Sequence, residues 1–562
     1  MRKLLWLLPI LVVTSAWAQT PVVTAVVEAA SQIPPRFPGY GIPPGGVMRI
    51  AGSNLGPATT VSGFPSFPLG TELAGTSVKV RSGQMELDAL VMSVQAAGVL
   101  AILPSATPLG SATLTVTHQG RTSAGVAIRV ADVAGIYTLN GRFAGPALVL
   151  NSRFEPVTLI NPARPGETVM LLVNARVPEP AGAVAAAEDL EQVQHLMAGA
   201  EPEASVDPRR PASFGQLFLQ DQVVPSLMSG RLFPGIAYEL FRIPANQRNS
   251  CWTSLYFRDQ NTMKSNIATI SVADSSLNIC DDPIGPSMRD LFRKATPGDV
   301  PFTVKGTFNR IDFKRDFGGS GGGQAFITKA FYEEGPIDFQ YFKDAWEISF
   351  GCYADLYSGQ RPPVFPDARY VDLGPDVQLL RGGITERLRR ASASLNVYQF
   401  TAASNPLSPF GPIDVLASGS PLVPGFRSVF QFPFAIPTTP IGASLVAGRT
   451  IDALNDLQIR LTNLPNRPDH HVEVGLSITL ANLSSSARIL CRMPPAELLT
   501  IPSWLLGMIP DGGANPMSLT VIYAPNRPYT SSGLPDRIGY ADVGDRIYSV
   551  LTGNMFRNSA AQ

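Results

Sequence analysis

The stretch VEVGLSITL, from Val472 to Leu480, shows the pattern that decides the fold of this chain. Apolar and other side chains alternate strictly along it, with Val472, Val474, Leu476, Ile478 and Leu480 on one side and Glu473, Gly475, Ser477 and Thr479 on the other. A period of two places successive side chains on opposite faces of an extended strand. The stretch therefore predicts a β-strand with one apolar face.

The same alternation recurs along the chain, and turn-forming residues separate the stretches that carry it. Leu457, Ile459 and Leu461 repeat it in the last third, and residues 111–118 and 125–130 repeat it near the N-terminus. The chain holds 50 Gly and 51 Pro, about 18% of its residues, which is below the roughly 25% that signals low-complexity disorder. Short strands joined by many turns are typical of β-sandwiches. We therefore predict an all-β protein built of sandwiches, with short helical interruptions.

Length, charge and cysteine content restrict the class of protein. The 562 residues exceed what one hydrophobic core can organise, and about 150 residues per domain gives roughly three to four domains. The 44 basic and 44 acidic residues balance, so the electrostatic signature of a nucleic-acid-binding protein is missing. Four cysteines without a C-x-x-C pair favour disulfides over zinc or a thiol nucleophile in an exported chain. They are Cys251, Cys280, Cys352 and Cys491.

The first twenty residues, MRKLLWLLPILVVTSAWAQT, have the pattern of a secretory signal peptide. A basic start precedes an apolar stretch from Leu4 to Val13, and Ala16-Trp17-Ala18 has the small-x-small form of a cleavage site. The apolar stretch is shorter than the roughly 20 residues of a membrane helix. We expect cleavage before Gln19 and a mature chain without a membrane-spanning segment. The protein is then secreted, extracellular or at the cell surface, with the periplasm as the alternative.

Residues 181–211 differ in composition from the strands around them. They are rich in Ala and Glu and predict one helix from about Ala183 to Met197, followed by a polar linker, before the alternation resumes at 216–219. We interpret this stretch as an insertion between strands, and predict another short helix at Ser287 to Ala295. The predicted domains are a signal peptide at 1–18, a sandwich at 19–131, a second sandwich at 132–275 with the insertion 181–211, a connecting segment with a short helix and strands at 276–340, and a β-rich C-terminal domain at 341–562.

Motifs between about Val23 and Ala273 resemble a repeated module of uncharacterised secreted proteins from soil bacteria, whose two halves resemble immunoglobulin-like IPT/TIG sandwiches. The matching stretches are PGG at 44–46, MRIAGSNLGP at 48–57, LAGTSV at 73–78, NPARPGE at 161–167, FPGIAY at 233–238 and SNIATISV at 265–272. The chain departs from the family at Val173-Asn174-Ala175, where the family carries a Gly-Leu-Gly corner. The resemblance implies several immunoglobulin-like β-sandwich domains in tandem with short helical insertions.

Residues 346–548 resemble a second region of the same group of proteins. The matching stretches are VDLGP at 371–375, ILCRMP at 489–494 and TIPSWLL at 500–506. This resemblance implies a disulfide between Cys352 and Cys491, and with it a second one between Cys251 and Cys280. It also implies exported, non-catalytic β-modules, and it brings no established activity.

The pair His470-His471 is the strongest candidate for a metal site, because imidazoles and carboxylates bind zinc or copper, and Asp469 and Glu473 flank the pair. Adjacent residues of a strand point to opposite faces, so we favour a polar turn that leads into a strand. Four histidines leave little for Ser-His-Asp or Cys-His catalysis, and no G-x-S-x-G motif precedes a helix. We predict no catalytic, cofactor-binding or metal-binding residue.

Three further patterns have a functional and a structural interpretation. The glycine-rich residues 318–323 lack the Lys-Ser or Lys-Thr of a phosphate-binding loop, and we interpret them as a hairpin tip or linker. Carboxylates that could form a glycosidase pair are equally typical of solvated faces; they are Asp281, Asp282, Asp344 and Glu347. Aromatic residues that could form a sugar-stacking surface are equally typical of cores; they are Trp252, Trp346, Trp504, Tyr353 and Tyr357.

The sequence therefore predicts a non-catalytic β-sandwich protein, secreted or at the cell surface, which acts as a binding, adhesion or structural module. Its expected partner is an extracellular polysaccharide or another surface protein, and nucleic acid is excluded. The alternative is an extracellular carbohydrate-active enzyme of the glycoside hydrolase type. An enzyme of that type needs two carboxylates that converge in a cleft, whereas a binding module needs only loops and exposed faces.

Overall fold

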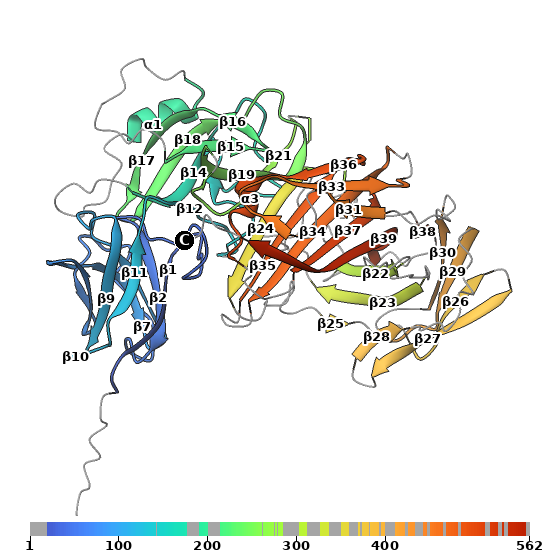
Figure 1. The fold of residues 1–562 in the computed structure, drawn as a ribbon, viewed down its shortest axis with the longest axis horizontal. Coiled ribbons are helices and arrows are strands. Elements are labelled where there is room, and N and C mark those ends of the chain that lie inside the picture. The colour runs from blue at the N-terminus through green and yellow to red at the C-terminus, as the bar shows by residue number, and fades with distance from the viewer. Residues whose placement is uncertain are drawn as a thin grey trace, which may run out of the picture.

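The computed structural model describes residues 19–284, except 142, 177–189, 201–213, 261, 275 and 278, and most strands with some of their connections between 303 and 557. These residues form an all-β protein of tandem immunoglobulin-like sandwiches with short helices, as predicted (Figure 1). The helices in the described part of the chain fall short of the length and apolar character that crossing a membrane requires.

The first sandwich consists of two antiparallel sheets. One has the order β1-β2-β8-β7-β3, and in the other β9 pairs with β11, β10 and β5, and β5 pairs with β4 and β6. If β1 is strand A of an immunoglobulin domain, the sheets have the order A-B-E-D and G-F-C of that fold. The strands are β1 (Val22–Glu28), β2 (Val47–Ser53), β3 (Val61–Ser62), β4 (Glu72–Leu73), β5 (Thr76–Ser82), β6 (Met85–Asp88), β7 (Leu90–Gln95), β8 (Gly98–Ile102), β9 (Gly110–His118), β10 (Arg121–Thr122) and β11 (Val126–Val130).

The alternating sequence pattern accounts for the core of this sandwich. Along β9, the side chains of Ala112, Leu114 and Val116 are buried, and the threonines between them lie on the outer side. Met48 and Ile50 of β2 face them across the core and are fully buried. The apolar residues at every second position therefore form the contact between the two sheets.

The second sandwich repeats the strand order of the first. One sheet has the order β12-β14-β18-β17, with β13 paired to β14, and the other has β16-β15-β19-β20, with β21 paired to β19. These are again the sheets A-B-E-D and G-F-C. The strands are β12 (Ala134–Ile136), β13 (Val149–Leu150), β14 (Thr168–Ala175), β15 (Gln216–Leu219), β16 (Gln222–Val224), β17 (Ser226–Phe233), β18 (Ile236–Arg242), β19 (Ser250–Asp259), β20 (Thr262–Met263) and β21 (Ala268–Val272).

The two sandwiches share individual hydrogen bonds at equivalent positions as well as their topology. In the turn before β2, Gly45 N–H donates to Leu103 C=O, and Leu103 N–H donates to Gly46 C=O. In the turn before β14, Gly166 N–H donates to Ile243 C=O, and Ile243 N–H donates to Glu167 C=O. Both turn glycines have a positive φ, 78° and 82°, which favours glycine. Ser123 and Ser265 also correspond, since each hydroxyl accepts a backbone N–H of the preceding strand. The two sandwiches are therefore copies of one structural unit.

The insertion between β14 and β15 contributes a helix, α1 (Leu190–Met197). The sequence predicts a helix that begins at about Ala183, but residues 177–189 lie outside the described part of the chain. Val193, Leu196 and Met197 of α1 are buried against the outer face of the sheet that contains β14. The strand pairing before the insertion is regular, because β14 pairs with β12 and β18 up to Ala175 and Val173.

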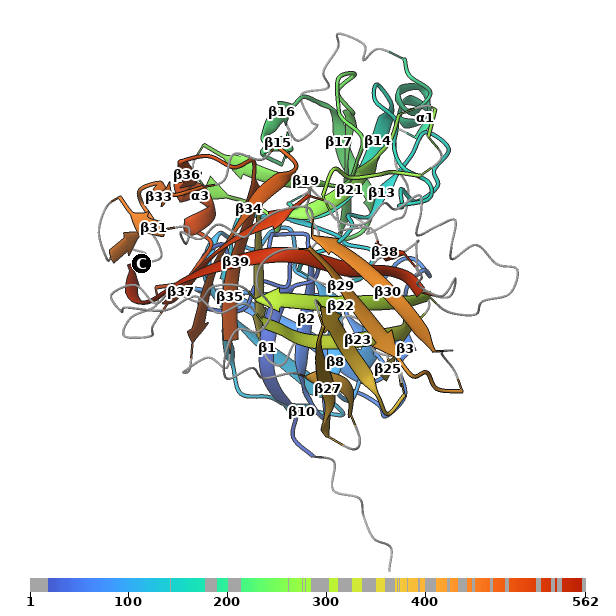
Figure 2. The ribbon, with the colours of Figure 1, turned by 90° about the vertical axis from the view of Figure 1, so that its right-hand side faces the viewer.

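The C-terminal part is dominated by one large sheet, with the order β24-β35-β34-β37-β39-β22-β23-β28-β27-β26-β29-β30-β38. β25 pairs with β23, and β32 pairs with β39, the long strand that crosses Figure 2. The strands are β22 (Thr303–Ile311), β23 (Phe326–Gly335), β24 (Gly351–Ser358), β25 (Arg369–Tyr370), β26 (Val377–Arg381), β27 (Ile384–Ser392), β28 (Leu395–Gln399), β29 (Gly411–Ala417), β30 (Phe426–Phe432), β32 (Thr450–Asp452), β34 (His470–Leu480), β35 (Ser485–Met493), β37 (Met517–Pro525), β38 (Ser531–Ser532) and β39 (Ile538–Arg557).

The segment 276–340, predicted to be a connecting segment with a short helix and strands, contributes two strands to this sheet. β22 pairs with β39 in parallel and with β23 in antiparallel orientation, so it lies inside the sheet rather than beside it. The sequence could not show this, because the two strands that β22 joins are far apart along the chain. The helix predicted at Ser287 to Ala295 lies outside the described residues.

A small sheet and a short helix cover the apolar side of β34. The small sheet has the order β31-β33-β36 and consists of β31 (Gly442–Leu445), β33 (Leu457–Thr462) and β36 (Leu498–Ile501), followed by α3 (Ser503–Leu506). Leu457, Ile459 and Leu461 of β33 are buried, and the residues between them are exposed, as the alternation predicts. They share one core with Val472 and Val474 of β34.

Two disulfides fix the ends of the sandwich and of the sheet. Cys251 bonds Cys280 with a Cα separation of 5.1 Å, and Cys352 bonds Cys491 with a Cα separation of 4.0 Å. This is the pairing that the resemblance implies. Cys352 and Cys491 are directly opposite each other on β24 and β35, so the bond holds the edge strand β24 in register.

Removal of each disulfide should lower stability, and more so for the bond that closes the longer loop. In the chain-entropy model, the 139-residue separation of Cys352 and Cys491 contributes about 5 kcal/mol, and the 29-residue separation of Cys251 and Cys280 about 3.5 kcal/mol. We expect the Cys352→Ala/Cys491→Ala variant to lose more stability in guanidinium unfolding than Cys251→Ala/Cys280→Ala. Equal transitions in the two variants and the wild type would contradict a stabilising role for either bond.

Candidate functional site

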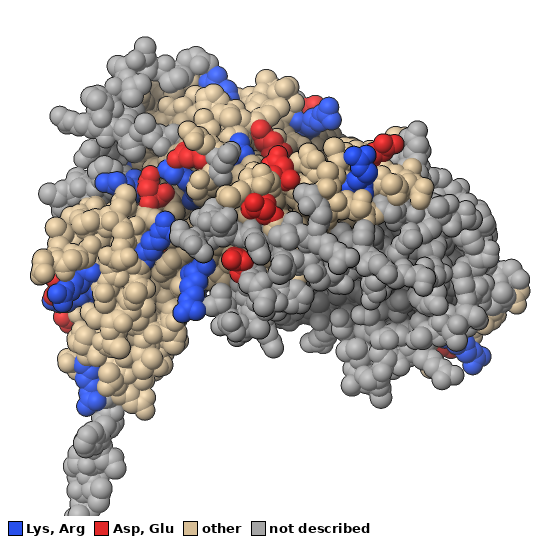
Figure 3. All heavy atoms as spheres, in the orientation of Figure 1, with Lys and Arg blue, Asp and Glu red and all other residues tan. Residues whose placement is uncertain are grey.

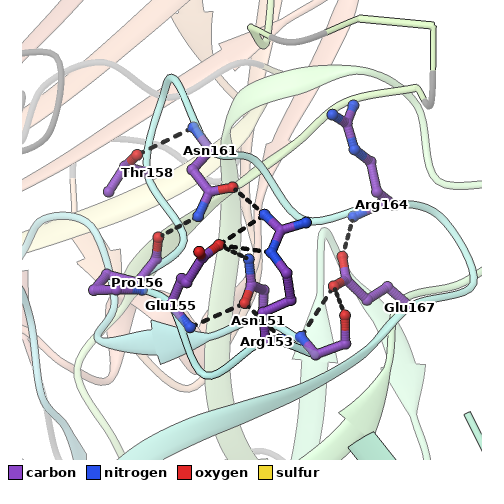
Figure 4. A network of polar contacts seen from close by, with 9 residues as sticks. Asn151, Arg153, Glu155, Pro156, Thr158, Asn161, Arg164 and Glu167 are labelled. Atoms are coloured by element: carbon purple, nitrogen blue, oxygen red, sulfur yellow. Dashed lines mark hydrogen bonds and ion pairs between the residues drawn. The ribbon is translucent and has the colours of Figure 1, made fainter. Parts of the chain in front are cut away.

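The candidate site is the loop 151–167, which connects β13 to β14 at one end of the second sandwich (Figure 4). Asn151 begins it with a buried side chain whose Oδ1 accepts the N–H groups of Arg153 and Glu155 at 2.9 and 3.0 Å. The Glu155 carboxylate accepts the Arg153 Nε–H at 2.8 Å and the Asn151 Nδ2–H at 3.3 Å. Three side chains thus close the first turn of the loop on itself.

Asn161 and Glu167 hold the second half of the loop. Asn161 donates Nδ2–H to the carbonyl of Pro156 at 3.0 Å, and its N–H reaches the Thr158 hydroxyl at 3.1 Å. The Glu167 carboxylate accepts the Ser152 hydroxyl at 2.8 Å and the Arg164 N–H at 2.8 Å. Figure 4 shows two groups of contacts, one that connects Asn151, Arg153, Glu155 and Asn161, and one around Glu167. Because these contacts link both ends of the loop, its conformation is set before any partner binds.

The loop packs against the disulfide Cys251–Cys280. Leu159 packs with both cysteines and with Trp252 and Ala273 in one buried cluster. The Arg164 guanidinium donates to the carbonyls of Ala273, Asp274 and Leu277, which belong to the segment between β21 and Cys280. The motif NPARPGE at 161–167 is therefore the part of the loop that binds the disulfide segment.

Two apolar side chains of the loop are partly exposed to solvent. Phe154 is 39% exposed and Ile160 is 37% exposed, although both belong to a loop that is otherwise held by polar contacts. Phe154 has a φ of 60°, a left-handed conformation that is an outlier for a bulky residue. Such conformations persist where surrounding contacts over-determine them, and they concentrate at functional sites. This combination marks the loop as a candidate binding surface.

The charges of the loop are mutually neutralised. Arg153 and Glu155 form an ion pair of 2.7 Å with both side chains largely exposed. The hydrogen bond from Arg153 lowers the pKa of Glu155, and the same bond raises the pKa of Arg153. A surface pair of this kind contributes little to stability. On the face shown in Figure 3, basic and acidic side chains are likewise interspersed over the described residues.

The histidine pair lies at the start of β34, and both side chains are buried. His470 stacks on Tyr523 at 4.8 Å and contacts Asp469 through Nδ1 at 3.0 Å. His471 contacts Asn526 through Nδ1 at 3.1 Å and Glu473 through Nε2 at 3.4 Å. The two imidazoles have separate partners, and the described residues contain no group of three His, Cys, Asp or Glu side chains arranged for a metal ion.

The other sequence candidates have structural positions or fall outside the described residues. Asp282 is buried and accepts the Cys251 N–H at 2.7 Å, which positions the disulfide segment. Trp252 and Tyr353 are also buried, so neither belongs to an exposed sugar-stacking surface. Residues 318–323, Asp344, Glu347 and Trp346 lie outside the described residues, and so does the side chain of Tyr357.

Trp504 of α3 joins the C-terminal part to the second sandwich. Its ring stacks on Tyr256 at 5.0 Å, and Tyr256 stacks on Phe218 at 5.3 Å. The Arg258 guanidinium lies over Phe218 at 4.2 Å and over Trp504 at 5.1 Å. Figure 1 accordingly places α3 between β19 and β24. The aromatic residue that looked like a surface candidate is therefore part of a contact between domains.

A buried carboxylate joins the two sandwiches, and no pattern in the sequence indicates it. Glu28, at the end of β1, accepts the N–H groups of Ala30 and Ser31 and an Nδ2–H of Asn174 from β14. The amide of Asn174 also pairs with both backbone groups of Val47, at 2.8 and 2.7 Å. Burial raises the pKa of Glu28, although its hydrogen bonds to Ser31, Ala30 and Asn174 oppose the rise. Burial and the nearby Glu28 also raise the pKa of Tyr137.

Comparisons with known proteins leave the family open. No family model matches the chain, and no curated protein matches it. Similar solved structures include the extracellular region of plexin A4 (9% identity, 87% of this chain, 30% of that chain, TM-score 0.16) and titin domains A168–A170 (9%, 72%, 94%, 0.13). Chicken CNTN1 domains FN1–FN3 are another (9%, 69%, 99%, 0.15). TM-scores this low carry no argument, so the immunoglobulin-like assignment depends on the strand order.

Glu28 should make the contact between the sandwiches dependent on pH. Because its pKa is raised above the ordinary 4.5, its contribution to stability is present below that pH and is lost as the pH rises through the raised value. Each unit of pKa difference corresponds to about 1.4 kcal/mol. We expect Glu28→Gln to remove this part of the pH dependence, measured by hydrogen exchange of the slow amides in β2 and β14. The control is Glu72→Gln on the exposed strand β4, which should leave the pH dependence unchanged; the same slope in both variants would contradict the assignment.

Proposed function

We propose that this chain is an exported, non-catalytic β-sandwich protein that binds an extracellular polysaccharide through the loop 151–167. The observation that supports the proposal most directly is the exposed ring of Phe154, held in a left-handed conformation by a closed network of side chains. A fixed loop loses little conformational entropy on binding, so its contacts contribute fully to affinity. The export signal in the sequence and the two disulfides agree with an extracellular site.

The chemistry around Phe154 fits a sugar chain. Sugars offer apolar C–H faces and many hydroxyls, which match an exposed aromatic ring beside hydrogen-bonding side chains. Arg153 and Glu155 precede and follow Phe154 along the chain and pair with each other, and Asn161 contacts Arg153 from the second half of the loop. Another surface protein is the alternative partner, since the loop also exposes the apolar side chain of Ile160.

A non-catalytic role agrees with the way in which the described carboxylates are used. Glu155 is paired with Arg153, and Glu167 accepts three groups of its own loop. Asp282 supports the backbone of Cys251. Glycoside hydrolysis needs one carboxyl group as an acid and a second one as a base or nucleophile, about 5 to 9.5 Å apart and facing the substrate. Carboxylates that already hold a loop together are poorly suited to these roles.

Phe154→Gly should separate binding from stability. Glycine adopts a positive φ without the roughly 1–2 kcal/mol that a left-handed conformation costs other residues, and the ring buries only part of its surface. Because the residue is only 39% exposed, the loss of its buried contacts offsets this gain, so we expect the variant of residues 19–562 to stay within about 1 kcal/mol of the wild-type stability and to bind polysaccharide at least about tenfold more weakly. Thermal unfolding and a glycan array with insoluble-polysaccharide pull-down measure the two effects.

The matched control is Val223→Ser, which removes an apolar side chain that is 55% exposed on β16. It should leave binding unchanged. Wild-type protein that binds no polysaccharide, or a Phe154→Gly variant that binds as well as the wild type, would refute the assignment of the loop. Release of reducing ends from a polysaccharide, lost in Glu155→Gln, would place the glycoside hydrolase alternative first.

A further inference from the structure

The loop 151–167 carries two basic and two acidic side chains, and they differ in how far a ligand can reach them. Arg164 donates to backbone carbonyls of the disulfide segment, and Glu167 accepts hydrogen bonds from the loop itself. Both of these residues are partly buried. Arg153 and Glu155 form the ion pair, and their side chains are 68% and 50% exposed. This pair is therefore the charged part of the loop that a bound chain would contact.

Each member of the ion pair keeps one hydrogen-bonding atom free. The Oε2 atom of Glu155 accepts Arg153 Nε–H at 2.8 Å and Asn151 Nδ2–H at 3.3 Å. The same oxygen lies 2.7 Å from Arg153 Nη2, which also contacts Asn161 Oδ1 at 3.4 Å. Within the described part of the chain, Glu155 Oε1 and Arg153 Nη1 form no hydrogen bond. The loop thus offers one acceptor and one donor, on the two residues that flank Phe154 in the sequence.

A sugar hydroxyl is the chemical group that matches both free atoms. It donates its O–H to Glu155 Oε1 and accepts an N–H from Arg153 Nη1. A ligand carboxylate or sulfate can only accept, and it would meet the negative charge of Glu155 as it approached Arg153. An ammonium group can only donate, and it would meet Arg153 as it approached Glu155. A charged group therefore gains one favourable and one unfavourable contact, whereas a hydroxyl gains two favourable ones.

A second carboxylate strengthens this balance. The hydrogen bond to Glu155 raises the pKa of Arg153, and the nearby charge of Glu167 adds to the rise. The guanidinium thus faces two negative charges of its own loop, and an anionic ligand would have to approach both of them.

We propose that the loop 151–167 binds an uncharged polysaccharide, and that Glu155 determines this selectivity by neutralising Arg153. The inference rests on the proposed function, because it names the class of chain that the same loop binds. Phe154, which is 39% exposed, contacts the apolar face of a sugar ring, and the ion pair binds its hydroxyls. Since no net charge is paired on binding, the affinity should be nearly independent of salt.

The test compares neutral and acidic polysaccharides on residues 19–562 by isothermal titration calorimetry. The neutral panel is β-glucan, xyloglucan, arabinoxylan and galactomannan, and the acidic panel is polygalacturonate and alginate. We expect the wild type to bind a member of the neutral panel with a Kd that changes less than about twofold between about 20 and 300 mM NaCl. It should bind the acidic chains at least about tenfold more weakly.

Glu155→Gln tests the residue that sets the selectivity. The amide oxygen still accepts hydrogen bonds from Arg153 and Asn151, so the loop keeps its contacts, but the guanidinium is no longer neutralised by its neighbour. We expect the variant to bind the acidic panel at least about fivefold more tightly than the wild type at low salt, and to lose this gain at high salt. It should bind the neutral chain no better than the wild type.

The matched control is Glu86→Gln, which changes the net charge by the same amount. Glu86 forms a 2.8 Å ion pair with Lys79 in the first sandwich, and both side chains are about half exposed. This variant should bind both panels as the wild type does. The wild-type comparison depends on no variant, so it tests the inference even if Glu155→Gln lowers stability.

The outcomes separate this inference from the proposed function. Wild-type protein that prefers the acidic panel, affinity for the neutral chain that falls steeply with salt, or a Glu155→Gln variant that gains no more than Glu86→Gln would overturn the inference and leave the proposed function in place. Wild-type protein that binds neither panel would overturn both. Binding of the neutral chain that persists in Phe154→Gly would also overturn both, because the site would then lie elsewhere.

Discussion

The constraint on which the rest of this structure depends is that apolar sheet faces must be covered on both sides. An isolated sandwich needs apolar residues only between its sheets, and its outer faces carry polar residues. Here the outer faces of the β2 and β14 sheets are apolar as well. Each needs a cover from outside the sandwich, which is the hairpin β17–β18 in one case and α1 in the other.

Polar contacts define the relative position of the two sandwiches, which apolar contacts alone would leave variable. Hydrophobic contact is not directional, whereas the two hydrogen bonds between the Asn174 amide and the backbone of Val47 define one relative position. Within the second sandwich, Asn266 uses its amide in the same way on Ile136, through a pair of bonds at 2.8 and 3.0 Å. Both amides are fully buried, so losing either bond would leave an unpaired polar group in the interior. The sandwiches therefore form a rigid unit.

The loop 151–167 is held at its base and at its tip. The disulfide Cys251–Cys280 and Arg164 fix the base of the loop, and the network around Asn151 fixes its tip. The backbone of Phe154 keeps its left-handed conformation at this tip because the contacts of the neighbouring residues hold it there. The surface on which we locate binding is therefore fixed by the disulfide and by the hydrogen bonds of the loop itself.

The sequence by itself determined the local structure. Alternation at 472–480 and 457–461 predicted the strands and their buried sides, because a period of two decides which side chains share a face. The resemblance of NPARPGE and the neighbouring motifs implied paired immunoglobulin-like sandwiches, and the strand order agrees. These features depend on residues that are neighbours along the chain, so a linear pattern can express them.

Only the tertiary structure decided which residues far apart in the sequence come into contact and which polar residues are buried. Glu28 and Asn174 are 146 residues apart and look like ordinary polar residues, yet packing removes water from both and makes each the partner of the other. His471 and Glu473 face the polar side of an alternating strand, and they are buried because other parts of the chain cover that side as well. The insertion 181–211 reads as a polar interruption, but the position of α1 on a sheet makes it a cover. Burial is a property of what packs against a residue, and a single stretch of sequence does not contain that information.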